Sequence, residues 1–181
     1  MGSAPRLARI AAAAVSVLAL AGCAPLTVNS YVDRAADFTR YRTFAWGPEE
    51  QLSTGDPRLD NNPFFHGRVQ AQIEKALTAR GLEKATGAPD LTIHYHASVT
   101  QEINAGTADR QYGYCEGDGC NPYVYEAGTL LIDLVDARSN RVVWRGWAEG
   151  PIDGVIENQD WMEERIDQAV ARILERFPTR L

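Results

Sequence analysis

The chain has 181 residues, of which 45% are hydrophobic, and 24 acidic residues against 18 lysines and arginines give a formal net charge of −6. This length corresponds to one domain that can bury a hydrophobic core. The acidic balance argues against a nucleic-acid partner, because phosphate backbones are bound by basic surfaces.

The N-terminal segment has the composition of an export signal. Arg6 and Arg9 precede an apolar run over residues 10–20, which ends in Leu20-Ala21-Gly22-Cys23. A charged start, a short apolar run and small residues at a cleavage site predict a signal peptide over residues 1–22. The run is too short for a membrane span, which needs about 20 apolar residues.

A cysteine directly after Leu-Ala-Gly resembles the lipobox of bacterial lipoproteins. The resemblance implies that Cys23 becomes the first mature residue and carries diacylglycerol and palmitate chains, which would anchor the protein in a membrane. The alternative is an ordinary cleaved signal, with Cys23 present by chance. Ala24 and Pro25 follow the cysteine, and by resemblance to Gram-negative lipoprotein sorting they favour the periplasmic face of the outer membrane over the inner membrane.

The mature chain is expected to be a tether followed by one domain. We expect residues 23–37 to form the lipidated tether, with Thr27–Tyr31 leading into the fold, and residues 38–181 to form a single periplasmic domain. Cleavage removes two of the 18 basic residues, so the net charge of the mature chain becomes −8.

Two elements are predicted in the first half of the domain. Residues 38–46 alternate in a pattern rich in aromatic and β-branched residues, which favours a strand, and the polar residues 47–62 favour a loop. Asn62 can cap a helix that has Pro63 at its first position and ends at Gly81. Its apolar stripe at helical spacing consists of Phe65, Val69, Ile73, Ala76 and Leu77.

Three strands are predicted next. Apolar and polar residues alternate over 90–103, which predicts a strand with one apolar face. A long connection over residues 104–125 follows. Residues 128–136 and 141–149 read as two strands, and the short turn between them predicts an antiparallel hairpin.

The last predicted element is a helix that begins near Asp160, with Glu163 placed for a capping box, and ends at Pro178. Its apolar stripe is Met162, Ile166, Ala169, Val170, Ile173 and Phe177. The order β-α-β-β-β-α predicts an α+β two-layer sandwich, in which two amphipathic helices cover one face of a mainly antiparallel sheet of about four strands.

Four segments together resemble one bacterial lipoprotein family, catalogued as domain of unknown function 4136. They are Tyr41–Trp46, Pro89–Tyr95, Gly128–Asp136 and Val143–Ala148, in that order behind the lipobox. The resemblance covers nearly the whole mature chain. It implies an envelope lipoprotein with no established activity, and it supplies no catalytic residue and no cofactor.

Two interpretations stay open for the histidines and cysteines. His94 and His96 project from the polar face of one strand, and with Cys115 and Cys120 they could form a four-ligand zinc site. The alternative is a solvent-facing strand and a Cys115–Cys120 disulfide, which export to an oxidising compartment favours. His66 should be a surface or partly packed residue without a role.

The candidate acidic groups have simple structural explanations. Asp133 and Asp136 could act as acid and base, but Asp136 precedes a turn and Asp133 is expected to be exposed or paired with Arg145 across the hairpin. The acidic turn at residues 116–119 is interpreted as a loop tip, with calcium binding as the alternative. Because no catalytic motif occurs, we do not expect an enzyme.

The aromatic residues suggest a binding surface. Trp144 and Trp147 should lie on opposite faces of a regular strand, unless Gly146 marks a bulge that brings them to one face. Trp46 and Trp161 are expected in the core. The candidate patch, whose alternative is aromatic packing under the long loop, consists of Tyr112, Tyr114, Tyr123, Tyr125 and Trp147.

The sequence therefore predicts a non-catalytic envelope lipoprotein that binds an envelope protein or stabilises an assembly, with residues 104–125 as the contact surface. The alternative is a small-ligand or metal-binding module that uses His94 and His96. An enzyme is the third hypothesis.

Overall fold

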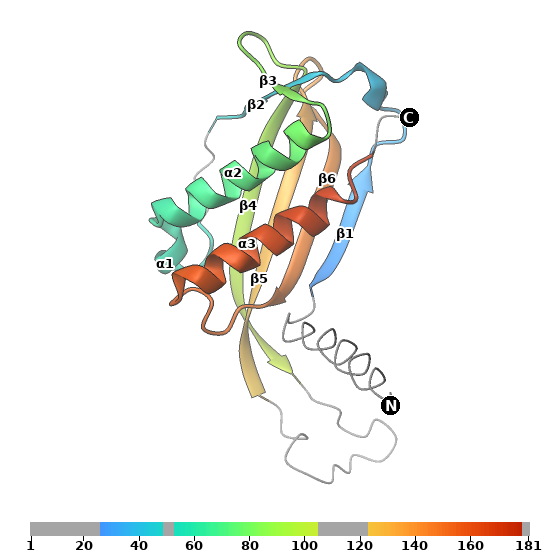
Figure 1. Ribbon diagram of the computed structural model, residues 1–181. Coiled ribbons are helices and arrows are strands. Elements are labelled where there is room, and N and C mark those ends of the chain that lie inside the picture. Colours follow the sequence, from blue (N-terminus) through green and yellow to red (C-terminus); the bar gives the residue numbers. More distant parts are fainter. Residues whose placement is uncertain (1–25, 49–52, 105–122, 179–181) are drawn as a thin grey trace, which may run out of the picture.

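The computed structural model describes residues 26–48, 53–104 and 123–178, which form an α+β fold (Figure 1). Six strands form one mixed sheet in the order β1-β6-β5-β4-β2-β3, and the two long helices α2 and α3 cover one of its faces. The elements in chain order are β1 (Thr27–Val32), a 3-10 turn (Phe38–Arg40), β2 (Thr43–Trp46), α1 (Pro57–Asp60), α2 (Pro63–Ala79), β3 (Glu83–Lys84), β4 (Leu91–Asn104), β5 (Tyr123–Asp136), β6 (Arg141–Pro151) and α3 (Gln159–Leu174).

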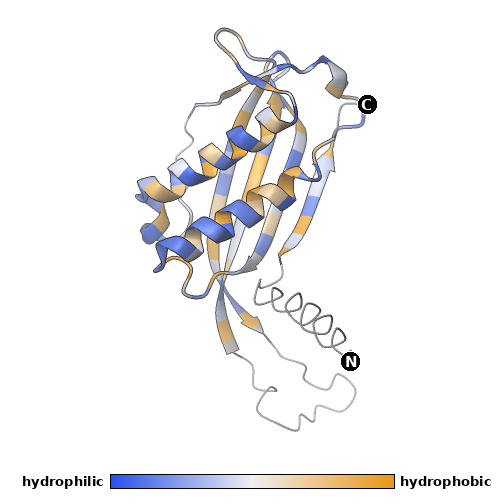
Figure 2. Ribbon diagram, in the orientation of Figure 1, coloured by the Kyte–Doolittle hydropathy of each residue, from blue (hydrophilic) through white to orange (hydrophobic). Residues whose placement is uncertain are grey.

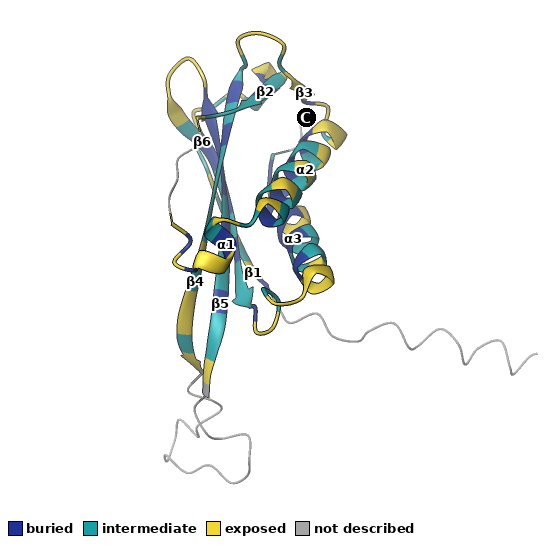
Figure 3. Cartoon of the chain, turned by 90° about the vertical axis from the view of Figure 1, so that its left-hand side faces the viewer, coloured by how far each residue is buried: buried dark blue, intermediate teal, exposed yellow. Residues whose placement is uncertain are grey.

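The α+β class and the two helices on one face are confirmed, whereas the strand count and order differ from the prediction. Figure 3 shows the sheet with α2 and α3 on one side only. The expected antiparallel core consists of β4, β5 and β6. Strands β1 and β3 add to it, and β2 pairs in parallel with both β3 and β4.

The expectation of a tether over residues 23–37 is wrong for residues 27–32. Thr27–Val32 is the edge strand β1, which pairs antiparallel with β6 from Thr27 opposite Glu149 to Val32 opposite Trp144. Val28 and Val32 pack against the core, and Leu26 is already buried. Six residues with only two apolar positions give a weak strand pattern, so the pairing partner decides the structure.

The predicted strand over residues 38–46 is also shorter than expected. Asp37 caps a 3-10 turn at Phe38–Arg40, and only Thr43–Trp46 forms a strand. The carboxylate of Asp90 accepts hydrogen bonds from the backbone N–H groups of Arg42 (2.8 Å) and Thr43 (3.0 Å). This long-range contact aligns β2 with the start of β4.

Helix α2 confirms its predicted boundaries. The side chain of Asn62 accepts a hydrogen bond from the N–H of Phe65, Pro63 is the first helical residue, and Gly81 follows the end with a positive φ of 79°. Helix α3 begins earlier than predicted, because Asn158 rather than Asp160 caps it. Trp161 is 56% exposed, so its expected place in the core is wrong.

The β5–β6 hairpin places Trp144 and Trp147 on opposite faces, as expected for a regular strand. Gly146 stands in regular register opposite Ile132, and the register shift lies instead between Leu134 and Val135. Trp144 is completely buried under α3 and makes edge-to-face contact with Phe177 at a centroid separation of 5.5 Å.

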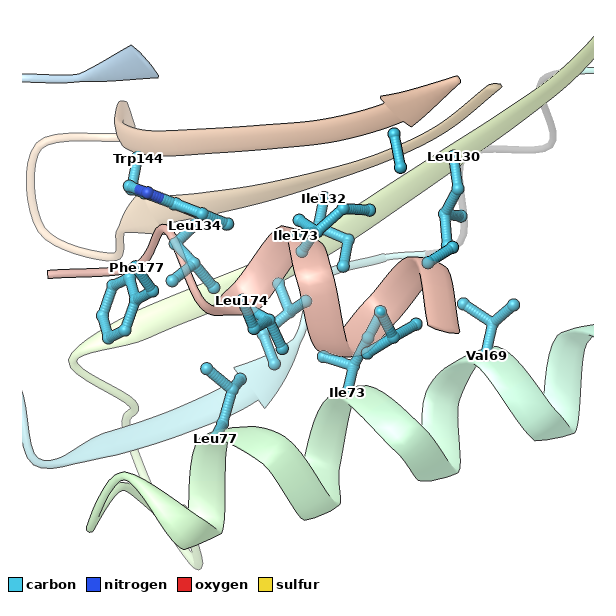
Figure 4. Close-up of a cluster of buried hydrophobic side chains, with 14 of the residues drawn as sticks. Val69, Ile73, Leu77, Leu130, Ile132, Leu134, Trp144, Ile173, Leu174 and Phe177 are labelled. Carbon is cyan, nitrogen blue, oxygen red and sulfur yellow. The ribbon is translucent and has the colours of Figure 1, made fainter. Parts of the chain in front are cut away.

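The core lies between the sheet and the two long helices. Figure 4 shows Val69, Ile73 and Leu77 of α2 directed toward β5 side chains and α3 residues. Figure 2 shows alternating hydropathy along the strands and hydrophilic residues on the outer sides of α2 and α3. Among the described ranges, no helix is both long and apolar enough to cross a membrane.

Candidate functional site

Strand β4 positions the candidate site, because its alternation sends neighbouring side chains to opposite faces. Ile93 and Tyr95 face the helices, whereas His94 and His96 face the side of the sheet that α2 and α3 leave uncovered. Strand β2 stops beside β4, where the N–H of Gly47 donates to the carbonyl of Ile93 at 2.9 Å.

A second segment returns to β4 further along the strand. The N–H of Val99 donates to the carbonyl of Thr54 at 2.7 Å, just before α1. Between the end of β2 and this segment, a cleft of about 620 Å³ opens beside β4. We call it the histidine cleft. Its described lining residues are Trp46, Gly47, Pro48, Ser53, Thr54, Asp60, Asn61, Phe65, His66, Gln70, Ile93, His94, Tyr95, His96 and Ala97.

All three histidines of the chain line this cleft, although His66 was predicted to have no role. His66 Nδ1 lies 2.6 Å from the Tyr95 hydroxyl, and Nε2 lies 3.3 Å from the backbone carbonyl oxygen of Asp60. A carbonyl can only accept, so neutral His66 carries its proton on Nε2 and accepts from the Tyr95 hydroxyl at Nδ1. The adjacency of His66 to the buried stripe residue Phe65 was the signal that could have revealed this packing.

His94 occupies the opposite wall of the cleft and packs against Gly47. A Cβ atom added at Gly47 would lie 2.2 Å from Cε1 and 2.3 Å from Nε2 of the His94 ring. Glycine at this position therefore makes room for the imidazole. In the part of the chain that the structure describes, no three His, Cys, Asp or Glu side chains are placed to bind a metal ion.

Trp46 forms the wall of the histidine cleft on the helix side, and Glu74 holds its indole in place. The indole N–H of Trp46 donates to Glu74 Oε1 at 2.7 Å, and Lys84 Nζ lies 2.7 Å from the same oxygen. The bonds from Lys84 and then from Trp46 lower the pKa of the Glu74 carboxyl. Trp46 also meets the Tyr95 ring edge-to-face at 6.0 Å, so an aromatic wall is fixed in place by an ion pair.

Both candidate catalytic carboxylates are engaged in structural contacts. Asp133 is 5% exposed and accepts two hydrogen bonds of 2.6 Å from Arg145, the cross-hairpin partner anticipated from the sequence. Asp136 caps the hairpin turn by accepting from the N–H of Ser139 at 2.8 Å, and it accepts from the Tyr41 hydroxyl at 3.0 Å.

The Asp136–Tyr41 contact shifts both groups. The backbone N–H of Ser139 is the main cause that lowers the pKa of Asp136, and the Tyr41 hydroxyl adds to it. Burial, and then the hydrogen bond to Asp136, raise the pKa of Tyr41 to about 12. Both effects favour one fixed arrangement, with Asp136 charged and Tyr41 protonated.

The predicted aromatic patch is only partly within the described structure. Trp147 is half-buried on the uncovered sheet face, opposite Leu131, and the Tyr125 hydroxyl donates to Glu102 at 2.7 Å. Leu131, the partner of Trp147, lies six residues from Tyr125 along β5, or about 20 Å at 3.3 Å per residue. Tyr125 and Trp147 are therefore not neighbours.

The remaining predicted site residues lie outside the described residues. They are Cys23, Tyr112, Tyr114, Cys115 and Cys120, and for Tyr123 only the backbone position in β5 is described. Lipidation, the disulfide and the four-ligand alternative with His94 and His96 therefore stay predictions.

Taken together, the fold and the cleft define a two-layer α+β domain with a site at the side of its sheet. The chain belongs to the family described as Domain of unknown function (DUF4136), whose model matches residues 28–179. The resemblance found in the sequence is thereby confirmed.

Two solved structures share the fold. A PDZ domain protein from Parabacteroides distasonis has a TM-score of 0.55 and 18% identity, covering 87% of this chain and 36% of that chain. A DUF4136 family protein from Bacteroides thetaiotaomicron has a TM-score of 0.50 and 16% identity, covering 81% of this chain and 95% of that chain. At such identities the likeness shows the fold alone.

One curated protein matches in sequence, an oxygen-dependent choline dehydrogenase of Pseudomonas aeruginosa (strain LESB58). The identity is 27% over 134 residues, which cover 54% of this chain and 24% of the dehydrogenase. The chain spans about a quarter of that relative's length, and no shared activity follows from the match.

Proposed function

We propose that this protein is a lipid-anchored component of the bacterial envelope, whose domain binds a ligand without transforming it. The anchor is supported by the order of Arg6, Arg9, the apolar run and Leu20–Cys23. Ala24 and Pro25 support the periplasmic face of the outer membrane as the location.

The anchor is tested by metabolic labelling with palmitate, intact-mass measurement and separation of inner and outer membranes. Cys23→Ser should lose the label, the added mass and the membrane fraction. The matched control is the double variant Cys115→Ser, Cys120→Ser, which removes two thiols and should keep all three. Label that persists in Cys23→Ser would refute the anchor.

The observation that carries the binding role is the histidine cleft. Its volume of about 620 Å³ lies within the range of small-molecule sites, which is roughly 300–1,000 Å³. It combines aromatic surface from Trp46 and Tyr95 with the imidazoles of His94 and His96, as sites that orient a ligand by a few polar groups do, whereas both ring nitrogens of His66 already have partners.

The charges around the histidine cleft favour an uncharged polar ligand. No lysine or arginine stands among its described lining residues. Its carboxylate, Asp60, already accepts from the N–H of Thr54 at 2.6 Å and from the hydroxyl of Ser53 at 2.8 Å. A ligand with amide or hydroxyl groups would pair with the histidines without leaving a buried charge unpaired.

Binding without catalysis is supported by the contacts of Asp133 and Asp136. Asp133 stands opposite His94 in the β4–β5 pair, but both of its oxygens bind Arg145, and Asp136 holds the hairpin turn, so both carboxylates are already engaged in structural contacts.

The binding role is tested by titrating histidine-labelled protein with N-acetylglucosamine and with N-acetylalanine amide while the imidazole NMR signals are recorded. Saturable shifts of the His66, His94 and His96 signals are expected with at least one probe. Gly47→Ala, which pushes the His94 ring into the cleft, should abolish them, whereas Gly87→Ala adds a methyl into open space and should not. Unshifted histidine signals with both probes would refute this ligand class.

A protein partner is a second candidate, favoured by the uncovered sheet face. Trp147 and Leu131 stand side by side there, and neither long helix covers them. In an in-cell crosslinking experiment, the band of the partner should disappear in Trp147→Ser. It should persist in Trp161→Ser, the control at an exposed tryptophan. Identical band patterns in both variants would argue against this surface.

A further inference from the structure

The paired ends of β4 and β5 project beyond the start of β1 and, by four residues, beyond the end of β6 at Pro151. Thr27, where β1 begins, stands in one row with Glu149, Thr129 and Ser98. Six more residues of each strand continue past this row, to Asn104 and Tyr123. We call residues 99–104 and 123–128 the β4–β5 arm. At 3.3 Å per residue it extends about 20 Å beyond the start of β1. Figures 1 and 3 show these strand ends projecting from the sheet.

The end of the β4–β5 arm carries apolar side chains that the domain does not cover. Ile103 is 72% exposed and Val124 is 60% exposed, and the two stand directly opposite each other in the antiparallel pair. On the other face, the Tyr125 hydroxyl donates to Glu102 at 2.7 Å. Exposed aliphatic side chains beside a tyrosine with a polar tip suit the boundary between water and lipid.

The anchor, on which this inference rests, leaves little freedom to the domain. Cys23 precedes Thr27 by four residues, which span at most about 14 Å when fully extended. Leu26 is 9% exposed and packs in the core, so the free chain is shorter still. The start of β1 must therefore lie close to the lipid that holds Cys23.

The short link brings whichever end of the sheet faces the membrane against the lipid. The β4–β5 arm extends about 20 Å from the start of β1, and in the other direction the sheet continues seven residues, from Ser98 back to Leu91, or about 23 Å. Both lengths exceed the reach of about 14 Å, so the chemistry of the two ends decides between the orientations. The turn at the opposite end exposes polar residues, among them Arg138 and Arg141, whereas the arm exposes Ile103 and Val124, which favours the arm directed at the membrane.

We propose that the β4–β5 arm touches the lipid surface through Ile103 and Val124. The contact is apolar rather than electrostatic, because the arm carries Glu102 and Glu126 and the mature chain has an excess of acidic residues. Arg58, which lies against Glu126 at 2.8 Å, has an acidic partner already. Raised salt should therefore leave the contact unchanged.

The test places a photo-crosslinking amino acid, p-benzoylphenylalanine, in the full lipidated chain in cells and detects lipid adducts by mass spectrometry. Position Val124, and Ile103 as a second site, should give several-fold more lipid adduct than Arg138, an exposed control in the turn at the opposite end of the sheet. The same amino acid at Tyr31, which is exposed on the edge strand β1, would give lipid adducts if the domain lay on that edge against the membrane. Lipid adducts at Tyr31 but not at Val124, or equal adducts at Val124 and Arg138, would overturn the proposal, as would protein adducts alone.

The anchor is measured separately in the same samples by intact mass and fractionation. Acylated, membrane-bound protein without lipid adducts at either arm position would overturn the arm contact and leave the proposed function standing. Protein without acyl chains at Cys23 would overturn both.

Discussion

Gly146 is a buried position at which one added methyl group should destabilise the fold. It lies in β6 between Trp144 and Ala148, facing α3. A Cβ atom there would stand 2.4 Å from Cη2 of Trp144 and 2.6 Å from Cγ2 of Ile173, whereas carbon atoms pack at about 3.5–4.0 Å. Both neighbours are completely buried, so neither can move aside without displacing others.

The expected effect of Gly146→Ala on the free energy of unfolding combines two opposing contributions. Overpacking a core costs about 1–3 kcal/mol, whereas replacing a strand glycine by alanine returns about 0.5–1 kcal/mol. We expect a net loss of about 1–2 kcal/mol. For a domain of this size, that loss lowers the melting temperature by about 2–8 °C.

The measurement is denaturant unfolding followed by tryptophan fluorescence, with Gly67→Ala as the matched control. Gly67 lies within α2, and a Cβ there meets nothing within 4 Å. That alanine should therefore stabilise the protein by about 0.8–1 kcal/mol through helix propensity alone. The same substitution should thus have opposite signs at the two sites, and a Gly146→Ala variant as stable as wild type would refute the packing argument.

The other predictions concern two buried contacts, Tyr41–Asp136 and Asp133–Arg145. In a phenolate absorbance titration, Tyr41, whose pKa is raised to about 12, should give a late transition that disappears in Tyr41→Phe. Since the pKa of Tyr41 lies above its unfolded value of about 10, its stabilising effect is complete below pH 10 and disappears as pH rises through 12. The lowered pKa of Asp136 gives stability that is complete above about pH 4 and is lost as pH falls through the folded pKa. Asp136→Asn should flatten that acid limb in denaturation curves and lower the pKa of Tyr41; an unchanged acid limb would contradict this. Arg145→Ala leaves the carboxylate of Asp133 buried and unpaired, so it should destabilise by about 1–3 kcal/mol, which allows for the partial exposure of the arginine. Arg141→Ala, at a surface pair, should cost at most about 1 kcal/mol, and equal losses would count against the Asp133 explanation.

Several elements could be predicted because their signals are local. The Asn62–Pro63 start, the Gly81 stop and the stripe from Phe65 to Leu77 all belong to one helix, and they define α2. Period-two alternation likewise defines most of β4 and the β5–β6 hairpin. Each signal follows from backbone geometry within a few residues, so it does not depend on the rest of the fold.

The histidine cleft shows what local signals could not provide. The sequence placed His94 and His96 on one polar face, but His66 belongs to α2, 28 residues before His94, and joins them only because the start of α2 packs against Tyr95 of β4. The space itself exists because β2 ends at Trp46, opposite Ile93, whereas β4 continues to Asn104.

By itself, the sequence determined the family, the export signal pattern, the two long helices and the antiparallel core. Those features depend on the order of neighbouring residues and on the spacing of apolar residues along the chain. Only the tertiary structure decided that Thr27–Val32 is a strand, that β2 runs parallel to β4, and that the β4–β5 arm lies at the same end as the start of β1. Strand pairing joins residues more than a hundred positions apart, and short strands gain their stability from the partner rather than from their own residues.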